Sequence, residues 1–220
     1  EAFGLGCAIP EWDGLLKALG RQGVTPADLA EVGLAVPRDQ SQRGSAGSGF
    51  YDRFRGRVMF PIRDLRKTVI AFGGRVLGDG LPKYLNSSES ALFSKGRTLF
   101  ALDVAREALQ RDGRAIIVEG YLDAIALHQA GVQGTVATLG TALTSDHVAL
   151  LRRFVKHVVL LFDPDAAGVR ASLRALDMFV DSGIGVTVVS LPDGHDPDTY
   201  IRAHGPEAFR ELEKRAPSLL

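Results

Sequence analysis

Four short runs rich in β-branched residues alternate with helical patterns between residues 114 and 191. The runs are "RAIIV", "GTVAT", "HVVLL" and "GVTVVSL", and they begin at residues 114, 134, 157 and 185. The segments between them carry apolar residues at the three-to-four spacing of an amphipathic helix. Strands and helices that alternate in this way join through right-handed crossovers into a mostly parallel sheet with helices on both faces. We therefore predict an α/β fold for this part of the chain.

The first 100 residues or so follow a different pattern. "PEWDGLLKAL" and "TPADLAEVG" are short helical patterns, and the second places Thr25 at the N-cap with Pro26 as the first helical residue. Residues 39–49 are rich in Ser and Gly, which predicts a mobile loop. "GRVMFPIRD" and "TVIAFGGRVL" flank the polar turn "DLRK" and predict an antiparallel hairpin.

These patterns predict a smaller mixed α+β subdomain ahead of the parallel sheet. We place the boundaries at 1–100 for the α+β subdomain, 101–200 for the sheet subdomain and 201–220 for the start of a further, truncated helical subdomain.

Length and composition exclude several classes of protein. The chain has 220 residues, of which 45% are hydrophobic, enough for a large apolar core. Its one cysteine, Cys7, excludes an internal disulfide and a cysteine-based zinc site, and it favours a reducing compartment. No apolar run approaches the roughly 20 residues of a membrane span, and no signal peptide is visible. We expect a cytoplasmic protein without membrane contact, and the start at Glu1 rather than Met suggests a piece of a longer protein.

The net charge of zero hides an uneven distribution. Residues 50–100 carry ten basic and four acidic groups, whereas residues 101–220 carry twelve basic and sixteen acidic groups. A basic segment beside an acidic one suits a protein that binds phosphates at one surface and metal ions at another. Solvated faces of an ordinary soluble protein would show the same counts.

Acidic residues follow the predicted strands at the point where each strand ends. Loops at the carboxyl ends of parallel strands converge on one edge of the sheet, which is where open α/β sheets bind their ligands. One further acid, Asp123, lies four residues after Glu119, which puts both on the same face of the helix that follows, one turn apart. The acids that follow the strands are Glu119, the pair Asp163 and Asp165, and Asp193, Asp196 and Asp198.

Carboxylates gathered at one edge repel one another unless a cation lies between them. Oxygen ligands without His or Cys suit Mg²⁺ or Mn²⁺, and the spread of acids suits two ions roughly 3.5 to 4 Å apart in phosphoryl chemistry. "DPDAAG" and "DPDTY" also fit a simpler role, in which each Asp caps a helix N-terminus. The five histidines have no ligand spacing, and we interpret them as surface or structural residues.

Several longer motifs resemble the Toprim domain of bacterial DnaG-type primases. They are "IIVEGYLDAIALHQAG", "ATLGTALTSDHVALL", "LLFDPDAAGVRAS" and "LPDGHDPDTYI". Upstream, "RFRGRVMFPIRD", "VIAFGGRVLG", "PKYLNSSES" and "FSKGRTLFAL" resemble the N-terminal subdomain of the same RNA polymerase core. The match covers nearly the whole chain in the order of the family, so it is more specific than a Toprim domain alone. It implies a Toprim-type, mostly parallel sheet flanked by helices and preceded by a smaller α+β subdomain.

The resemblance also implies roles for the acids. Glu119 would be a metal ligand or the general base for the attacking 3′-hydroxyl, and Asp163 and Asp165 would be a paired acidic motif beside it. Gly120 would allow a close approach of the backbone, and Gly140 has either the same role or that of a simple turn. The implied metal ligands are Glu119, Asp123, Asp163, Asp165, Asp196 and Asp198.

The spacing of the basic residues between positions 50 and 100, together with the resemblance, suggests roles for them as well. Arg53, Arg55 and Arg57 alternate, so in an extended strand they would line one face as a ridge that binds DNA phosphates. A solvated edge strand would show the same alternation. Lys95 and Arg97 are further implied contacts to DNA. Tyr84 beside Lys83 suits a base and a phosphate but also simple packing. The implied nucleotide-binding residues are Arg75, Lys83, Tyr84 and Asn86.

We expect a DNA primase catalytic core that makes short RNA primers on single-stranded DNA from ribonucleoside triphosphates, with two or more Mg²⁺ or Mn²⁺ ions and no zinc in this fragment. The expected replicative helicase would bind through regions absent here, and a monomer at the replication fork is the default. Two alternatives stay open, namely another metal-dependent Toprim nuclease or topoisomerase and a single-strand-binding fragment without catalysis. A nuclease would degrade DNA without nucleotides, and a binding fragment would be indifferent to divalent metal.

Overall fold

The computed structural model describes residues 2–38, 49–162, 175–180 and 182–218. The chain forms two compact units. The first comprises Glu1–Ile62 with Thr68–Ser94, and the second comprises Arg63–Lys67 with Lys95–Leu220. The predicted mobile loop at 39–49 lies almost entirely outside the described residues.

The first unit is built on a four-stranded sheet with the strand order β1-β4-β5-β6. The predicted hairpin is present, because β4 and β5 are neighbours and the turn between them closes with a 2.9 Å bond from Lys67 N to Asp64 O. The strands are β1 (Gly6–Ala8), β4 (Arg57–Arg63), β5 (Val69–Val76) and β6 (Tyr84–Asn86).

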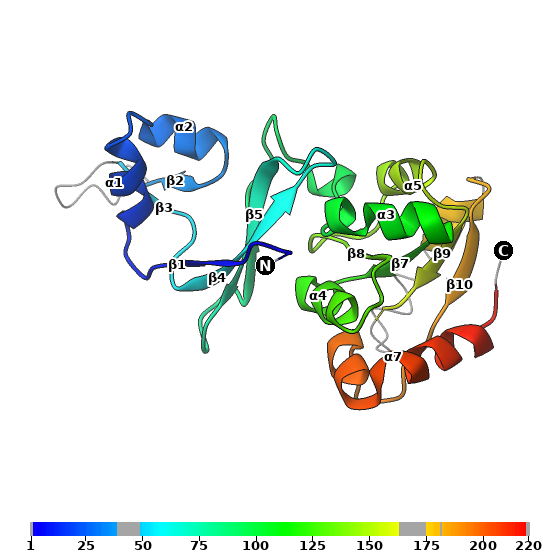
Figure 1. Cartoon of the computed structure of the whole chain (residues 1–220). Coiled ribbons are helices and arrows are strands. Elements are labelled where there is room, and N and C mark those ends of the chain that lie inside the picture. Colours follow the sequence, from blue (N-terminus) through cyan, green and yellow to red (C-terminus); the bar gives the residue numbers. More distant parts are fainter. Residues whose placement is uncertain (1, 39–48, 163–174, 181, 219–220) are drawn as a thin grey trace. The chain divides into compact units, whose positions relative to one another are not determined.

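A two-stranded sheet and two short helices complete this unit (Figure 1). Helix α2 begins as predicted, with the Thr25 side chain accepting from the backbone N–H of Asp28 and the Asp28 carboxylate accepting from the N–H of Thr25. Such reciprocal capping supplies partners for N–H groups that a helix start otherwise leaves unpaired. The elements are β2 (Ala35–Pro37), β3 (Phe50–Asp52), α1 (Gly14–Gly20) and α2 (Pro26–Glu31).

The second unit contains the predicted parallel sheet, with the strand order β10-β9-β7-β8 and parallel pairing throughout. Strand β7 is buried from Ala115 to Val118, as expected for a central strand covered on both faces. The fold class predicted from the sequence is therefore confirmed. The strands are β7 (Arg114–Val118), β8 (Thr135–Ala137), β9 (His157–Leu160) and β10 (Gly185–Val188).

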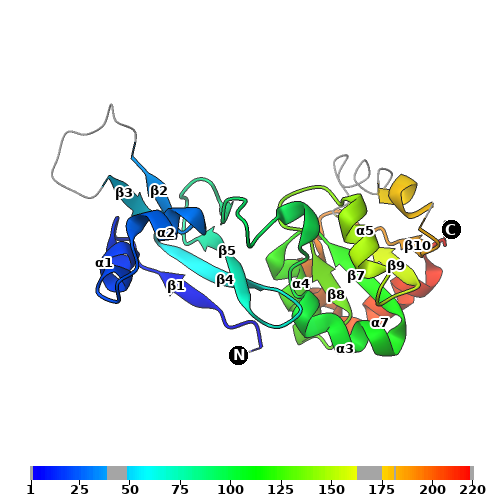
Figure 2. The same ribbon diagram turned by 90° about the horizontal axis from the view of Figure 1, so that it is seen from above.

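Helices cover both faces of this sheet, with α3 and α5 on one side and α4 and α7 on the other (Figures 1 and 2). The strand order explains the arrangement. The chain moves from β7 outward to β8 and then back past β7 to β9, so two right-handed crossovers in opposite directions leave their helices on opposite faces. The helices are α3 (Leu102–Asp112), α4 (Tyr121–Gln129), α5 (Ser145–Leu151) and α7 (Pro197–Arg215), with a 3-10 turn, η2, over Lys95–Arg97.

Helix α7 packs against α4 and is kinked in its middle. The kink lies at Gly205, whose φ of 77° is open to glycine, and Pro206 follows it without an N–H for the helix. The segment between β9 and β10 carries one of the predicted helical patterns, and its described residues 175–180 are helical.

Substitution of Ile117 should destabilise the second unit, because this side chain in β7 is 0% exposed and belongs to the core of the sheet. Ile117→Ala should lower the free energy of unfolding by about 2 to 5 kcal/mol through lost burial and an added cavity. Ile117→Val, the matched control, should cost only about 0.5 to 1.5 kcal/mol. Urea unfolding followed by circular dichroism measures both, and equal losses for the two variants would contradict this account of the core.

Candidate functional site

Glu119 lies at the carboxyl edge of the parallel sheet, directly after the last residue of β7. Its side chain is exposed, although the four residues before it are buried. The neighbouring strand β9 runs parallel, and Leu161 N donates to Ile117 O over 3.0 Å beyond its end. Residues that follow β7 and β9 therefore start from the same edge. Asp163 and Asp165, predicted to follow β9, lie outside the described residues.

Gly120 makes room for a second acid. A Cβ atom at this position would lie 2.6 Å from Oδ2 of Asp123, closer than real Cβ contacts allow. The backbone φ of Gly120 is −115°, which other residues also adopt, so a side chain here would require only a shift of the Asp123 carboxylate. Gly140 differs, since its φ of 69° fits the alternative of a simple turn.

The acids at the start of α7 divide between two roles. Asp196 caps the helix, with Oδ1 accepting from Thr199 N over 2.7 Å and Asp196 N donating to the Thr199 hydroxyl over 2.9 Å. Burial opposes ionisation of Asp196, but the bonds from Thr199 prevail and lower the pKa of this carboxyl below its ordinary value. The capping alternative weighed for "DPDTY" is thus what the structure shows for Asp196.

Asp198 links α7 to α4. Its backbone N–H donates to Oδ1 of Asp123 over 3.2 Å, and its own carboxylate pairs with Arg202 one turn later at 2.5 Å. The structure therefore brings Asp123 and Asp198 together across these two helices.

The described acids have the right chemistry for a hard divalent cation. Glu119, Asp123 and Asp198 offer carboxylate oxygens only, which is the ligand type that Mg²⁺ and Mn²⁺ prefer. Among the described residues no group of three His, Cys, Asp or Glu side chains is close enough to hold an ion. The assignment of Glu119, Asp123 and Asp198 as metal ligands stays a prediction.

Two of the predicted nucleotide-binding residues face each other in the first unit. Arg75 in β5 is paired with Tyr84 in β6, and its guanidinium carbon lies 5.9 Å from the centre of the Tyr84 ring. The Nε–H of Arg75 is buried and donates to no partner among the described residues, so this guanidinium has hydrogen-bonding capacity left. Lys83 and Tyr84 are exposed, the latter by 40%.

The predicted ridge of three arginines on one face of a strand is wrong. Strand β3 ends at Asp52, and Gly56 has a φ of 58°, so residues 53–56 form a bend instead of an extended strand. Arg57, at the start of β4, is only 6% exposed, and its Nη1 donates to the carbonyls of Gly74 and Lys83 at 3.3 and 3.4 Å. Burial and the nearby Arg55 lower the pKa of Arg57.

The side chains of Arg53 and Arg55 contact different parts of the first unit. Nε of Arg53 donates to the backbone oxygen of Asn86 over 2.9 Å. The Arg55 guanidinium lies 4.1 Å from the Trp12 ring centre and 5.1 Å from that of Tyr51, and it donates to Asp52 O. The two rings form an edge-to-face pair with centres 5.5 Å apart.

The sequence pattern does not predict this aromatic pair. Trp12 is 56% exposed, and Arg38 also lies 5.9 Å from both rings. Exposed aromatic rings beside arginines are a common surface for stacking bases of single-stranded nucleic acid. Trp12, the one tryptophan of the chain, lies within a predicted helical pattern, but α1 begins only at Gly14.

Lys95 and Arg97 lie on η2 in the second unit, and buried His147 holds this turn in place. Nε2 of His147 lies 3.0 Å from Lys95 O and 3.1 Å from Thr98 O, while its Nδ1 accepts from Thr144 N. The Thr144 hydroxyl donates to Gly96 O. Burial lowers the pKa of His147 below 6.5, although the hydrogen bonds to the two carbonyls oppose this shift. The ring is therefore neutral at neutral pH.

The family models match both units in turn. The model described as "DNA primase catalytic core, N-terminal domain" matches residues 1–106, and the Toprim model matches residues 113–190. Curated DNA primases include that of Clostridium acetobutylicum, 44% identical over 99% of this chain, and that of Pseudomonas aeruginosa, 47% identical over 94% of it. The chain spans 35% and 31% of these two proteins.

Solved structures agree with these matches. A primase domain from Pseudomonas aeruginosa is 47% identical with a TM-score of 0.89, and the alignment covers 99% of this chain and 67% of that one. The Escherichia coli primase catalytic core is 44% identical with a TM-score of 0.88, covering 99% of this chain and 68% of the other. A DnaG primase catalytic domain bound to single-stranded DNA is 43% identical with a TM-score of 0.89 and covers 67% of that chain.

The second unit, with its parallel sheet and Glu119 at the carboxyl edge, thus contains a Toprim domain. The chain belongs to the catalytic-core family of bacterial DnaG-type DNA primases.

Stability at mildly acidic pH should depend on His147. The unfolded chain binds a proton on this histidine below about pH 6.5, whereas the folded chain resists it until a lower pH, so stability contributed by the neutral ring is lost as the pH falls through that window. Urea titrations between about pH 7 and about pH 5 should show a shallower loss for His147→Gln than for the unsubstituted chain. The same slope in both proteins would show that His147 does not titrate as described.

Proposed function

We propose that this chain is the RNA polymerase core of a bacterial primase, which makes short RNA primers on single-stranded DNA. The observation that carries the proposal is the exposed carboxylate of Glu119 at the edge of a Toprim sheet, in a chain whose first unit matches the primase core. The relative solved with single-stranded DNA supports such DNA as the template. The reaction would join a ribonucleotide to a 3′-hydroxyl with loss of pyrophosphate.

In this proposal Glu119 and Asp123 hold divalent cations together with Asp163 and Asp165, and Asp198 supports Asp123 through its backbone N–H. Asp196 completes the acidic set from its place at the helix cap. Two bound Mg²⁺ or Mn²⁺ ions would stabilise the charge that develops on the phosphate and on the attacking and leaving oxygens. Glu119 is also a candidate base for the 3′-hydroxyl proton.

The first unit would bind the nucleic acid and the incoming nucleotide. Arg75 has an unused buried donor, and exposed Lys83 and Tyr84 offer a charge for phosphate and a ring for a base. Asn86 would support this group, since its backbone oxygen receives the bond from Arg53. Arg57, which is buried against Lys83 O, would act by positioning Lys83.

Template binding would use two sets of residues. In the first unit Arg53 and Arg55 would contact phosphates beside the exposed Trp12 ring, and in the second unit Lys95 and exposed Arg97 would contact phosphates as well. We propose further that the protein works as a monomer in the cytoplasm at the replication fork, with a replicative helicase bound through other regions. No helix within the described residues is long and apolar enough to cross a membrane.

Loss of the Glu119 charge should weaken metal binding and stop synthesis. Glu119→Gln keeps the shape of the side chain, so its binding to single-stranded DNA should stay unchanged. Mn²⁺ binding followed by electron paramagnetic resonance should weaken about tenfold or more, since a charged ligand is lost. Primer synthesis from ribonucleoside triphosphates should fall below detection.

Glu107→Gln removes the same charge from an exposed position on α3 and serves as the control. It should bind Mn²⁺ and make primers as the unsubstituted chain does. Unchanged Mn²⁺ affinity in Glu119→Gln would contradict the metal assignment, and DNA degradation without nucleotides would favour a nuclease.

Removal of Arg55 should weaken DNA binding in a salt-dependent way. Arg55→Ala loses one phosphate contact and the cation over Trp12, so the slope of log affinity against log salt should become shallower by about one. Arg21→Ala removes one exposed charge from the same unit outside the cluster of arginines and aromatic rings, and it should leave the slope unchanged. Fluorescence anisotropy with labelled single-stranded DNA measures both variants, and equal slopes would contradict a role of Arg55 in the template site.

A further inference from the structure

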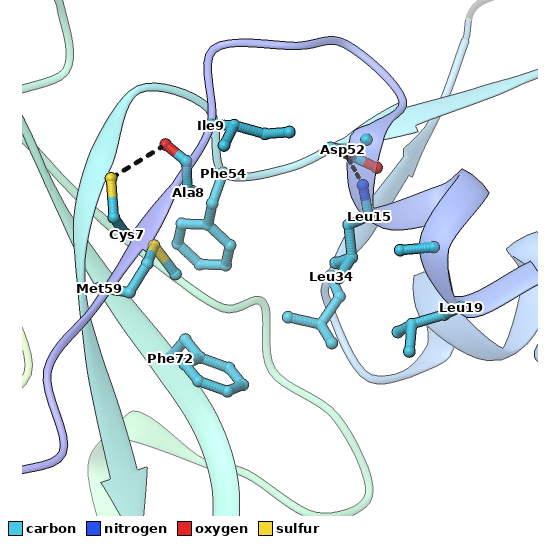
Figure 3. Close-up of a pocket in the computed structure, with 12 residues that line it drawn as sticks. Cys7, Ala8, Ile9, Leu15, Leu19, Leu34, Asp52, Phe54, Met59 and Phe72 are labelled. Carbon is cyan, nitrogen blue, oxygen red and sulfur yellow. Dashed lines mark hydrogen bonds between the residues drawn. The ribbon is translucent and has the colours of Figure 1, made fainter. Parts of the chain in front are cut away.

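A cavity of about 480 Å³ lies in the first unit between α1 and the strands beneath it (Figure 3). Leu15, Leu19 and Leu34 line one side, and Phe54, Met59 and Phe72 line the other. The volume falls within the range of about 300 to 1,000 Å³ that is usual for small-molecule sites. The cavity is separate from the carboxylate edge and from the exposed face of Trp12, neither of which contributes to its lining.

Apolar side chains dominate the wall of this cavity. The cavity is partly open to solvent, and a small aromatic molecule that enters it would gain free energy from burial against these side chains. The two phenylalanine rings offer edges and faces for a flat guest. An aromatic ligand would therefore bury apolar surface that the folded chain leaves uncovered.

Asp52 provides the charged group of the lining. It is 3% exposed, and its two carboxylate oxygens accept from the backbone N–H groups of Leu15 and Leu16 at 2.6 and 3.0 Å. An ionised carboxylate has about four acceptor positions, so capacity for another donor is left. The same charge disfavours any anion in this space.

We propose that this cavity binds a small neutral aromatic molecule that carries one N–H or O–H donor directed to Asp52. Its size, its apolar wall and the buried carboxylate of Asp52 together define this class of ligand. The inference does not depend on primase activity. Indole is a suitable probe because it combines a flat apolar ring system with one N–H group.

Ala18 gives the sharpest test of the site. It lines the cavity from α1 and is itself exposed, so a larger side chain can be placed there without disturbing a buried position. Ala18→Phe should fill part of the space that the ligand needs. Ala203→Phe puts the same side chain on an exposed position of α7 in the other unit and is the matched control.

The experiment measures indole binding to the whole chain by ligand-observed NMR and by amide shifts. Indole should bind the unsubstituted chain and Ala203→Phe equally, shift the amides of Leu15 and Leu16, and bind Ala18→Phe about tenfold more weakly. Indole-3-carboxylate should bind the unsubstituted chain about tenfold more weakly than indole. Circular dichroism checks that both variants are folded.

Two results would overturn the proposal. Equal indole binding to Ala18→Phe, or amide shifts confined to other regions, would place the ligand elsewhere. No indole binding, together with sedimentation as a dimer that Ala18→Phe dissociates, would show that a second copy of the chain covers the cavity. Because no DNA, metal or nucleotide is present, failure here leaves the proposed primase function intact, and failure of primer synthesis leaves this site intact.

Discussion

The parallel pairing of β7 with β9 is the constraint on which the second unit depends. It puts the residue after β7 and the chain after β9 at the same carboxyl edge of the sheet. The hydrogen bond from Leu161 N to Ile117 O lies at this end of the two strands. Burial of β7 on both faces fixes this pairing, since slippage would expose Ile116 or Ile117 to solvent. Glu119 follows directly after the last buried residue of β7, and this position at the end of the strand explains why its side chain is exposed.

Asp52 has a comparable place in the first unit. Its carboxylate caps α1 through Leu15 and Leu16, its N–H donates to Trp12 O over 2.8 Å, and its carbonyl receives the Arg55 guanidinium. Asp52 therefore connects the start of α1, the backbone of Trp12 and the side chain of Arg55. Asp52 also lines the apolar cavity, so the candidate template contacts and the candidate ligand site share this residue.

The sequence predicted the features that depend on local pattern. The strand at 114–118 follows from its β-branched residues, and the start of α2 follows from Thr25 and Pro26, because both depend on neighbours within a few positions. It could not predict contacts between distant residues. The start of α1 depends on an acid 36 or 37 residues away, and the Trp12 stack depends on a bend at Gly56 that removes residues 53–56 from any strand. Asp196 shows a second limit of prediction from sequence. Its motif fits both a helix cap and a metal ligand, and in the structure Asp196 caps α7.

Diffraction from crystals soaked with Mn²⁺ and a ribonucleoside triphosphate, collected near the manganese absorption edge, tests the central claim most directly. The account predicts anomalous peaks beside Glu119 and Asp123, with carboxylates of Asp163 and Asp165 as further ligands. An acidic edge without manganese, at ion and nucleotide concentrations that support synthesis by other members of the family, would contradict it.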